Sequence, residues 1–275
     1  MVTRDTPWPP GTPCWVDLAV DDVQAASAFY QALFGWALSP WDGSPWGGSA
    51  GDGSAGDGSA GDARPGRPAA AGYHVAHQYG RSVAGIGPKM PDQPAAWITY
   101  LATDDADATA AAVTVAGGQL LAEPADVPGQ ARVAIAADPA GAVFGLWQAG
   151  LTTGIGLANE PGSLCWSEQH SGDLNGSIDF YRAVFGNEPE EMTADYVLLK
   201  AAGQDSHVGG IGAAAGPAGW SAYFAVADTA TSLALAQGLG ATVVRPVWDS
   251  DWGPMVTLAD DQGAVFSLCT APADA

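Results

Sequence analysis

The chain opens with alternating apolar and polar positions followed by a stretch with helical periodicity. The run WVDLAV from Trp15 alternates as expected of a half-buried strand. Over residues 23–35, the apolar side chains of Phe29 and Leu33 fall on one helical face, and Gly35 is typical of a helix C-terminus. Further strand patterns follow at residues 73–77 and 82–87. The pattern predicts a strand, a helix and then more strands.

This order of elements returns three more times. Strand patterns begin again at Trp97, Leu164 and Ser221, and each is followed by a helical stretch and then by two or three strands. Rossmann and TIM folds alternate strands and helices one for one, so the arrangement excludes both. Four tandem βαβββ units predict the α+β class.

The units form two copies of a longer repeat. The segment AFYQALFG at Ala28 returns as DFYRAVFG at Asp179, which is 151 positions later. CWVD at Cys14 returns as CWSE at Cys165 with the same offset. A duplicated unit carries duplicated positions, so any site in one half has a counterpart in the other.

The first half carries an insertion. DPAGAVFGL at Asp138 returns as DDQGAVFSL at Asp260 after only 122 positions, so the first half is longer by 29 residues. Residues 41–72 include a repeated Gly/Ser/Ala/Asp pentad without apolar periodicity, which predicts a mobile, solvated loop. We therefore expect two domains, residues 11–150 with an insert at 42–70, and residues 160–271.

Composition narrows the classes of partner. The 275-residue chain has 30 acidic and nine basic residues, a formal net charge of −21, which disfavours nucleic acid and anionic lipid as partners. The acidity favours a cationic small molecule, although it also serves solubility. Neither a signal-like N-terminus nor an apolar run of about 18 residues is visible, so we expect a soluble cytoplasmic protein. The odd number of cysteines, Cys14, Cys165 and Cys269, predicts reduced thiols as small buried strand residues.

Several motifs resemble one known family. They are the FYxxxFG helix ends at Phe29 and Phe180, the aspartates before the second and fourth predicted helices at Asp104 and Asp228, the glycines that end those helices at Gly117 and Gly240, and the DPxG-type turns at Asp138 and Asp260. Over residues 11–271 the chain resembles tandem members of the vicinal oxygen chelate superfamily, the glyoxalase, bleomycin-resistance and extradiol-dioxygenase group, including accessory or "hydroxylase" proteins of anthracycline pathways. The resemblance implies two glyoxalase-like domains, each a cup-shaped mixed sheet with the ligand on its concave face.

Metal-using members of this superfamily carry His or Gln on each opening strand and Glu on each closing strand. Aligned here are Trp15, Ile98, Trp166 and Ser221 on the opening strands and Gly145 and Ser267 on the closing strands. These side chains are poor ligands for a divalent ion. The four histidines, His74, His77, His170 and His207, have no mates at the repeat offsets. We therefore expect neither a metal nor another cofactor.

The cups carry a repeated Trp-x-acid pair instead. Strand alternation points Trp15 and Asp17 into the first cup, and Trp166 and Glu168 into the second. The other candidate ligand-binding residues are aromatic: Tyr100, Trp147, Tyr223, Trp248 and Trp252, the last two in a predicted loop before the final strand pair. Alternatively, several of these rings simply fill a core. No residue is assigned a catalytic role, although proton transfer by a lone buried acid stays open.

An acid beside an aromatic wall suits a planar ligand that carries an amine. We expect metal-independent binding of an anthracycline-like natural product, in antibiotic sequestration and self-resistance or as an accessory to a biosynthetic oxygenase, with the second cup favoured. The alternative is an enzyme of the same superfamily, an oxygenase or hydroxylase, lyase or isomerase in secondary metabolism. A third hypothesis is an interaction module that uses the insert. A monomer and a homodimer are both compatible with the sequence.

Overall fold

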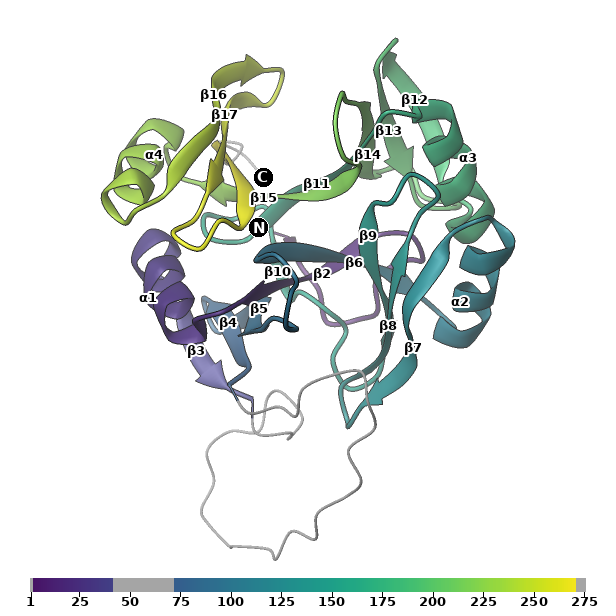
Figure 1. Ribbon diagram of the computed structural model, residues 1–275, viewed down its shortest axis with the longest axis horizontal. Helices are drawn as coiled ribbons and strands as arrows, with labels where there is room; N and C mark the ends of the chain where they lie inside the picture. Colours follow the sequence, from purple (N-terminus) through teal and green to yellow (C-terminus); the bar gives the residue numbers. More distant parts are fainter. Residues whose placement is uncertain (1, 42–71, 271–275) are drawn as a thin grey trace, which may run out of the picture.

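Two eight-stranded mixed sheets make up most of the molecule (Figure 1). The computed structural model describes residues 2–41 and 72–270. The predicted insert at 42–70 lies outside the described residues. Each half of the chain forms one sheet, and the order of elements is four βαβββ units, as the apolar pattern predicts.

The first sheet has the order β3-β4-β5-β2-β6-β9-β8-β7. Its strands are β2 (Pro13–Val20), β3 (Ala37–Pro40), β4 (His74–Gln78), β5 (Arg81–Pro88), β6 (Ala96–Thr103), β7 (Gln119–Val127), β8 (Ala131–Ala137) and β9 (Val143–Ala149). The opening strands of its two units, β2 and β6, pair antiparallel at the centre. Each closing strand runs parallel beside its opening strand, β5 beside β2 and β9 beside β6.

The second sheet repeats this plan in the order β12-β13-β14-β11-β15-β18-β17-β16. Its strands are β11 (Leu164–Ser171), β12 (Glu188–Thr193), β13 (Tyr196–Lys200), β14 (His207–Ala213), β15 (Gly219–Val226), β16 (Thr242–Ser250), β17 (Gly253–Ala259) and β18 (Val265–Thr270). Two short strands, β1 (Val2–Thr3) and β10 (Leu157–Ala158), pair separately. The fold class is α+β, with two glyoxalase-like cups.

Aspartates start all four helices: α1 (Val23–Phe34), α2 (Ala106–Val115), α3 (Leu174–Phe185) and α4 (Thr229–Gly238). The caps are Asp22, Asp105, Asp173 and Asp228, whose carboxylates accept hydrogen bonds from backbone N–H groups of the first turn. Asp105 caps α2, so the motif aspartate Asp104 lies one residue before the cap. Gly35 and Gly186 end α1 and α3 in the left-handed conformation that glycine adopts without steric cost.

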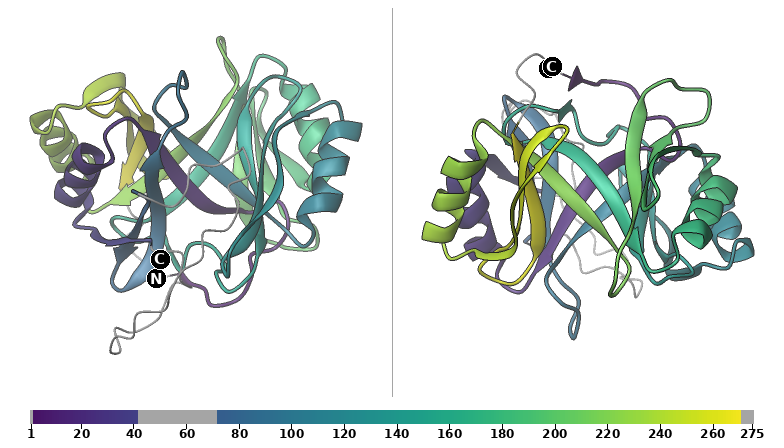
Figure 2. Two further views of the ribbon diagram at one scale, coloured as in Figure 1. Left: turned by 60° about the horizontal axis from the view of Figure 1, so that its bottom comes forward. Right: turned by 90° about the horizontal axis from the view of Figure 1, so that it is seen from above.

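The helices pair across the two halves of the chain. Helix α1 lies beside α4 at one side of the molecule and α2 beside α3 at the other (Figures 1 and 2). The buried Tyr30 hydroxyl donates to Oδ2 of Asp260 at 3.0 Å, and the Tyr181 hydroxyl donates to Oδ2 of Asp138 at the same distance. The DPxG-type turn of one half therefore meets the FYxxxFG helix of the other.

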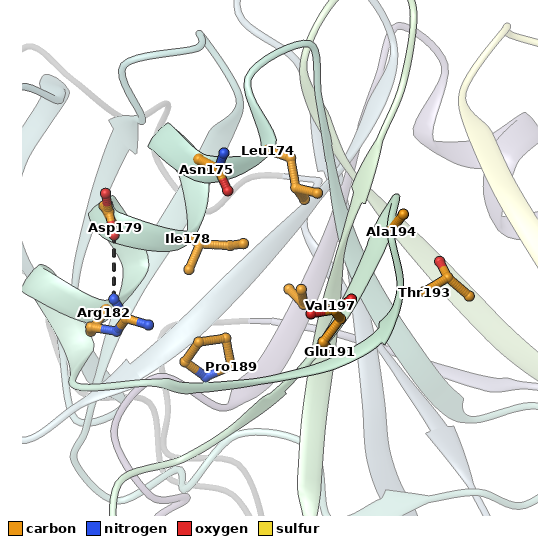
Figure 3. A pocket seen from close by; sticks show the side chains of 10 residues that line it. All are labelled: Leu174, Asn175, Ile178, Asp179, Arg182, Pro189, Glu191, Thr193, Ala194 and Val197. Atoms are coloured by element: carbon orange, nitrogen blue, oxygen red, sulfur yellow. Dashed lines mark hydrogen bonds and ion pairs between the residues drawn. The ribbon is translucent and has the colours of Figure 1, made fainter.

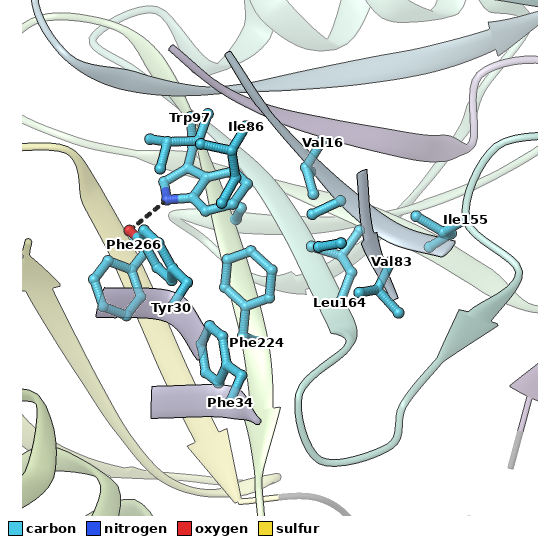
Figure 4. Close-up of a cluster of buried hydrophobic side chains, with 14 of the residues drawn as sticks. Val16, Tyr30, Phe34, Val83, Ile86, Trp97, Ile155, Leu164, Phe224 and Phe266 are labelled. Atoms are coloured by element: carbon cyan, nitrogen blue, oxygen red, sulfur yellow. Dashed lines mark hydrogen bonds between the residues drawn. The ribbon is translucent and has the colours of Figure 1, made fainter. Parts of the chain in front are cut away.

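The main core lies between the helix-facing sides of the two sheets. One continuous cluster contains Val16 and Leu18 from the first half with Phe224 and Phe266 from the second, and the buried Trp97 indole donates to the Tyr30 hydroxyl at its edge (Figure 4). Because the sheets pack back to back, their concave faces point away from each other. No helix in the part of the chain that the structure describes is long and apolar enough to span a membrane.

Candidate functional site

The second cup has a carboxylate cluster on its floor. Glu168 lies on β11 and is only 9% exposed. The Tyr196 hydroxyl donates to its Oε2 at 2.8 Å, and the Tyr223 hydroxyl donates to its Oε1. Nε2 of His170 lies 3.1 Å from the same Oε1. Three side chains on β11, β13 and β15 thus converge on one acid.

The cluster holds Glu168 as an anion. Burial alone raises the pKa of this carboxyl, but the hydrogen bond and charge of His170, together with the bonds from Tyr223 and Tyr196, lower it below its ordinary value. Burial and the neighbouring carboxylate raise the pKa of both tyrosines. At neutral pH the second cup therefore contains a negative carboxylate and two neutral phenols.

Tryptophans pack beside the residues that bind this carboxylate. The Trp166 indole donates to the Tyr196 hydroxyl at 3.0 Å. Trp252 stacks over Trp166 with 6.3 Å between the ring centroids and 22° between the planes. Trp248 lies on β16 rather than in the predicted loop, and only Trp252 occupies the β16–β17 turn. The Arg245 guanidinium lies 3.7 Å from the centroid of the Trp248 ring. The curl of the sheet thus brings the last hairpin to the opening strand.

The first cup repeats this cluster in a more buried form. The Trp15 indole donates to Oδ1 of Asp17 at 2.6 Å, and the Tyr73 hydroxyl donates to the same oxygen. Trp147 stacks on Trp15 at 5.5 Å and meets Tyr100 edge-on at 5.9 Å. The side chains of Trp15, Asp17, Tyr100 and Trp147 are all at least nine-tenths buried.

Two substitutions between the copies account for the difference. Trp147 pairs with Ala102 in the first sheet, and Cys269 pairs with Ala225 at the same place in the second, so a bulky ring is replaced by a small sulfur. Trp15 is fully buried, whereas its repeat mate Trp166 is half-buried. The second substitution places His170 in the second cup where the first has alanine. The second cup is thus the more accessible and the richer in hydrogen-bonding groups.

The prediction of three reduced cysteines was wrong for two of them. Cys165 and Cys269 form a disulfide, while Cys14 remains a buried thiol. Strands β11 and β18 lie on either side of β15, which brings two residues 104 positions apart together. The number of cysteines in the sequence does not show which strands become neighbours, so this pairing could not be predicted from it.

A separate groove of about 630 Å³ lies outside both cups, between α3 and the hairpin of β12 and β13 (Figure 3). It is lined by Leu174, Ile178 and Val197, with the Arg182 and Asp179 ion pair along one edge. None of the nine predicted ligand-binding residues lines it. This groove is therefore separate from the predicted ligand-binding residues.

Residues 14–146 match the sequence profile of the Glyoxalase/Bleomycin resistance protein/Dioxygenase superfamily. CFP32 of Mycobacterium tuberculosis is 35% identical over 94% of both chains, and the anthracycline biosynthesis protein DnrV of Streptomyces peucetius is 34% identical over 96% of this chain and 94% of its own. The chain belongs to this superfamily. Its fold also matches an Mn(II)-bound glyoxalase from Novosphingobium aromaticivorans, with a TM-score of 0.63, 16% identity and coverage of 96% of this chain and 83% of that one.

The superfamily includes metal-binding proteins, so we asked whether either cup offers a suitable set of donors. In the first cup Asp17 pairs with Gly85, and Tyr100 pairs with Gly145. The residues opposite the closing-strand glycines are thus Asp17 and Tyr100, each two positions after the aligned residues Trp15 and Ile98. The second cup has Glu168 beside Gly210 and Tyr223 beside Ser267. Among the residues described, each cup therefore has its carboxylate on an opening strand, and none of the closing strands β5, β9, β14 and β18 carries one.

Tyrosines fill the space above the closing-strand glycines. A Cβ on Gly85 or Gly210 would collide with the hydroxyl of Tyr73 or Tyr196, respectively. Among the described residues, no three His, Cys, Asp or Glu side chains gather closely enough to hold a metal ion. Within residues 2–41 and 72–270, neither cup fits a divalent ion, because the first has one acid beside tyrosines and the second has one acid, one histidine and tyrosines.

Sequence reasoning missed Tyr73 and Tyr196, the second hydroxyl donor of each cup. The two are repeat mates only after the insert is removed, which hides their offset of 123 positions. A signal was nevertheless present, since the strand motifs VAGIG and VGGIG place paired glycines at Gly85 and Gly210. Glycine in a strand interior often marks close approach of another group, here a tyrosine.

Proposed function

We propose that the second cup binds a planar aromatic small molecule that carries an amine, without a metal ion. The proposal depends on one observation: Glu168 is buried and anionic, and the aromatic wall of Trp166, Trp248 and Trp252 packs beside the tyrosines that donate to it. A buried carboxylate favours hydrogen-bond donors and cationic partners, because a charge without enough of them is costly away from water.

The carboxylate has capacity for such a partner. A carboxylate offers about four acceptor positions, and Tyr196, Tyr223 and His170 account for three. An ammonium group of the ligand would take the remaining position through a charge-assisted hydrogen bond. Since His170 is about one-third exposed, it marks the side from which the ligand approaches.

The aromatic residues suit the planar part of the ligand. Trp252 is 51% exposed and stacks on the half-buried Trp166, so a ligand gains contact area by covering a ring that water now surrounds. Trp248 already holds the flat Arg245 cation on its ring face, which is the geometry that a cationic ligand would use.

The relatives favour a natural-product role. DnrV of Streptomyces peucetius and DauV of Streptomyces sp. strain C5 are both named anthracycline biosynthesis proteins, the latter 34% identical over 96% of this chain. An anthracycline has the planar rings and amino sugar that the second cup suits. We therefore propose a role in sequestration and self-resistance or as an accessory to a biosynthetic oxygenase.

The test is a titration with daunorubicin, which carries an amine, beside its aglycone, which lacks the amine. We expect tryptophan quenching at micromolar daunorubicin and binding of the aglycone at least tenfold weaker, because a charge-assisted hydrogen bond contributes roughly 1.5–3 kcal/mol. Glu168→Gln should remove the preference for the amine. The repeat mate Asp17→Asn is the matched control and should retain it. Equal binding of both compounds, or no quenching, contradicts the proposal.

A second candidate function is an enzyme of the same superfamily that transfers a proton. Its supporting observation is the contact between Nε2 of His170 and Oε1 of Glu168, which has no counterpart in the first cup. Mass spectrometry of daunorubicin incubated with the protein distinguishes the two functions. A product that depends on His170 favours the enzyme, and unchanged ligand in a stable complex favours binding.

A further inference from the structure

We infer that Cys165 and Cys269 are a redox-active pair that sets the shape of the second cup. The part of this inference that concerns ligand affinity rests on the proposed function. The part that concerns the protein alone does not, and the two are tested separately below.

The pair crosses the sheet over one intervening strand. Cys165 lies on β11 at a register shift, Cys269 lies on β18, and β15 runs between them. The residue of β15 that pairs with Cys269 is Ala225, whose small side chain leaves room for the two sulfurs to meet. The bond therefore ties the opening strand of one unit to the closing strand of the next.

The sulfurs belong to the wall of the ligand site. Cys165 and Cys269 pack in one cluster with Trp166, Trp248 and Tyr223, all predicted ligand-binding residues. Tyr223 is also the residue whose hydroxyl donates to Glu168. Breaking the bond would thus remove a side-chain cross-link beside the rings and the carboxylate, while β15 continues to pair with both β11 and β18.

The residues around Cys165 and Cys269 are compatible with both the disulfide and the two reduced thiols. Cys165 is half-buried and so is accessible to a small thiol, whereas Cys269 is buried. Sγ of Cys165 lies 3.3 Å from the Tyr223 carbonyl oxygen, which would accept a hydrogen bond from the reduced thiol. The pair therefore has a route for thiol–disulfide exchange and a hydrogen-bond acceptor for the reduced Cys165 thiol.

The first cup has no corresponding cysteine pair. The repeat mates of the pair are Cys14 and Trp147, so a disulfide cannot form there. Cys14 is fully buried, and burial raises the pKa of its thiol well above the ordinary value, which makes it unreactive. Cys14 is therefore an internal control for thiol chemistry in the same molecule.

The reaction is thiol–disulfide exchange with a small-molecule thiol. A thiolate attacks Sγ of Cys165, the bond between the sulfurs breaks, and Cys269 leaves as a thiolate that takes up a proton. A second thiolate then attacks the mixed disulfide and releases a small-molecule disulfide and the Cys165 thiolate, which is protonated. Two thiols are oxidised and one protein disulfide is reduced. The reverse reaction consumes a small-molecule disulfide such as oxidised glutathione.

The first experiment uses the full chain without ligand. Thiol titration in denaturant should find one thiol after treatment with oxidised glutathione and three after dithiothreitol, as the disulfide and Cys14 require. Reduction of the native protein should change tryptophan fluorescence. Cys269→Ser should abolish this change and Cys14→Ser should preserve it. Three thiols after oxidation, or a change that persists in Cys269→Ser, overturns the inference.

The second experiment compares daunorubicin affinity in the two redox states. We expect reduction to weaken binding roughly tenfold in the wild type and in Cys14→Ser, and Cys269→Ser to bind like the reduced protein in both states. Equal affinity in both wild-type states overturns the coupling. Absence of binding in both states, together with the fluorescence change, contradicts the proposed ligand and leaves the redox pair supported.

Discussion

The Tyr196 hydroxyl donates a 2.8 Å hydrogen bond to Oε2 of Glu168 while it accepts one from the Trp166 indole at 3.0 Å. One phenol thus links the carboxylate to the aromatic wall of the second cup. In the first cup the corresponding indole, on Trp15, donates directly to Asp17. Removing the phenol oxygen therefore breaks two hydrogen bonds in the second cup.

Tyr196→Phe is expected to lower the free energy of unfolding by roughly 1.5–3 kcal/mol, because a buried carboxylate loses a donor and an indole loses its acceptor. Urea denaturation at pH 7 measures the change. Tyr79→Asn, which removes an exposed ring in the turn before β5, is the control and should stay within about 0.5 kcal/mol of the wild type. A Tyr196→Phe protein as stable as the wild type would show that the two hydrogen bonds contribute little.

The lowered pKa of Glu168 predicts a specific dependence of stability on pH. A carboxyl whose pKa is lower in the folded state contributes stability above its unfolded pKa, ordinarily 4.5, and loses it as the pH falls through the folded value. The difference in unfolding free energy between wild type and Glu168→Gln should be largest at pH 7 and shrink below about pH 4.5. Urea denaturation at a series of pH values tests this, and a constant difference contradicts it.

Trp252 is expected to affect binding without affecting stability. Its ring is 51% exposed, so Trp252→Ala removes little buried area from the free protein but removes a stacking surface for the ligand. Daunorubicin affinity should fall by about 0.5–1.5 kcal/mol, several-fold in Kd, with an unchanged urea midpoint. Tyr79→Asn again serves as the control. A Kd equal to that of the wild type would exclude Trp252 from the site.

Gly210 makes room for Tyr196, and this relationship can be measured. Gly210→Ala places a Cβ against the Tyr196 hydroxyl and should destabilise the protein by roughly 1–3 kcal/mol through overpacking. In a Tyr196→Ala background the clash is gone, so the same change should cost less, with a coupling of at least about 0.5 kcal/mol. Strict additivity in a double-mutant cycle would show that the glycine serves another purpose.

Hydrogen bonds between the two halves should contribute to the free energy of unfolding. Tyr30→Phe leaves Asp260 without its phenol donor and the Trp97 indole without its acceptor, which should cost about 1–3 kcal/mol. Tyr181→Phe removes the equivalent bonds at the other side and should cost a similar amount. Both variants should still unfold in one transition, measured by calorimetry. A large effect of one variant and none of the other would indicate that the two junctions differ in strength.

The apolar pattern was sufficient to predict the four units and the α+β class, because each strand and helix has a clear period and the repeat fixes their order. The two cups were predicted from the family resemblance. The exact ends of helices and strands were harder to predict. Asp104 and Asp105 are chemically equivalent as helix caps, and only backbone geometry selects Asp105. Trp248 was predicted to lie in a loop, yet it lies on β16, an edge strand that tolerates the proline and aspartates around it.

The candidate site was only partly visible in the sequence. Alternation along one strand was sufficient to pair Trp166 with Glu168. The donors Tyr196 and His170 depend on which strands become neighbours and on where the sheet curls, and neither follows from local periodicity. The same applies to the disulfide of Cys165 and Cys269, which joins strands from two different units.

The contacts of Tyr30 with Asp260 and of Tyr181 with Asp138 have the form of an isologous interface. In the first, the tyrosine comes from the first half and the aspartate from the second, and in the other contact this order is reversed. A single half would carry both the tyrosine and the aspartate, and could satisfy them only on a second copy of itself. The linker between the halves therefore acts as a tether, which replaces a concentration-dependent homodimer by an intramolecular one. Because the two cups need not be identical, they can diverge, one towards a filled aromatic core and the other towards a more exposed set of aromatic and hydrogen-bonding residues.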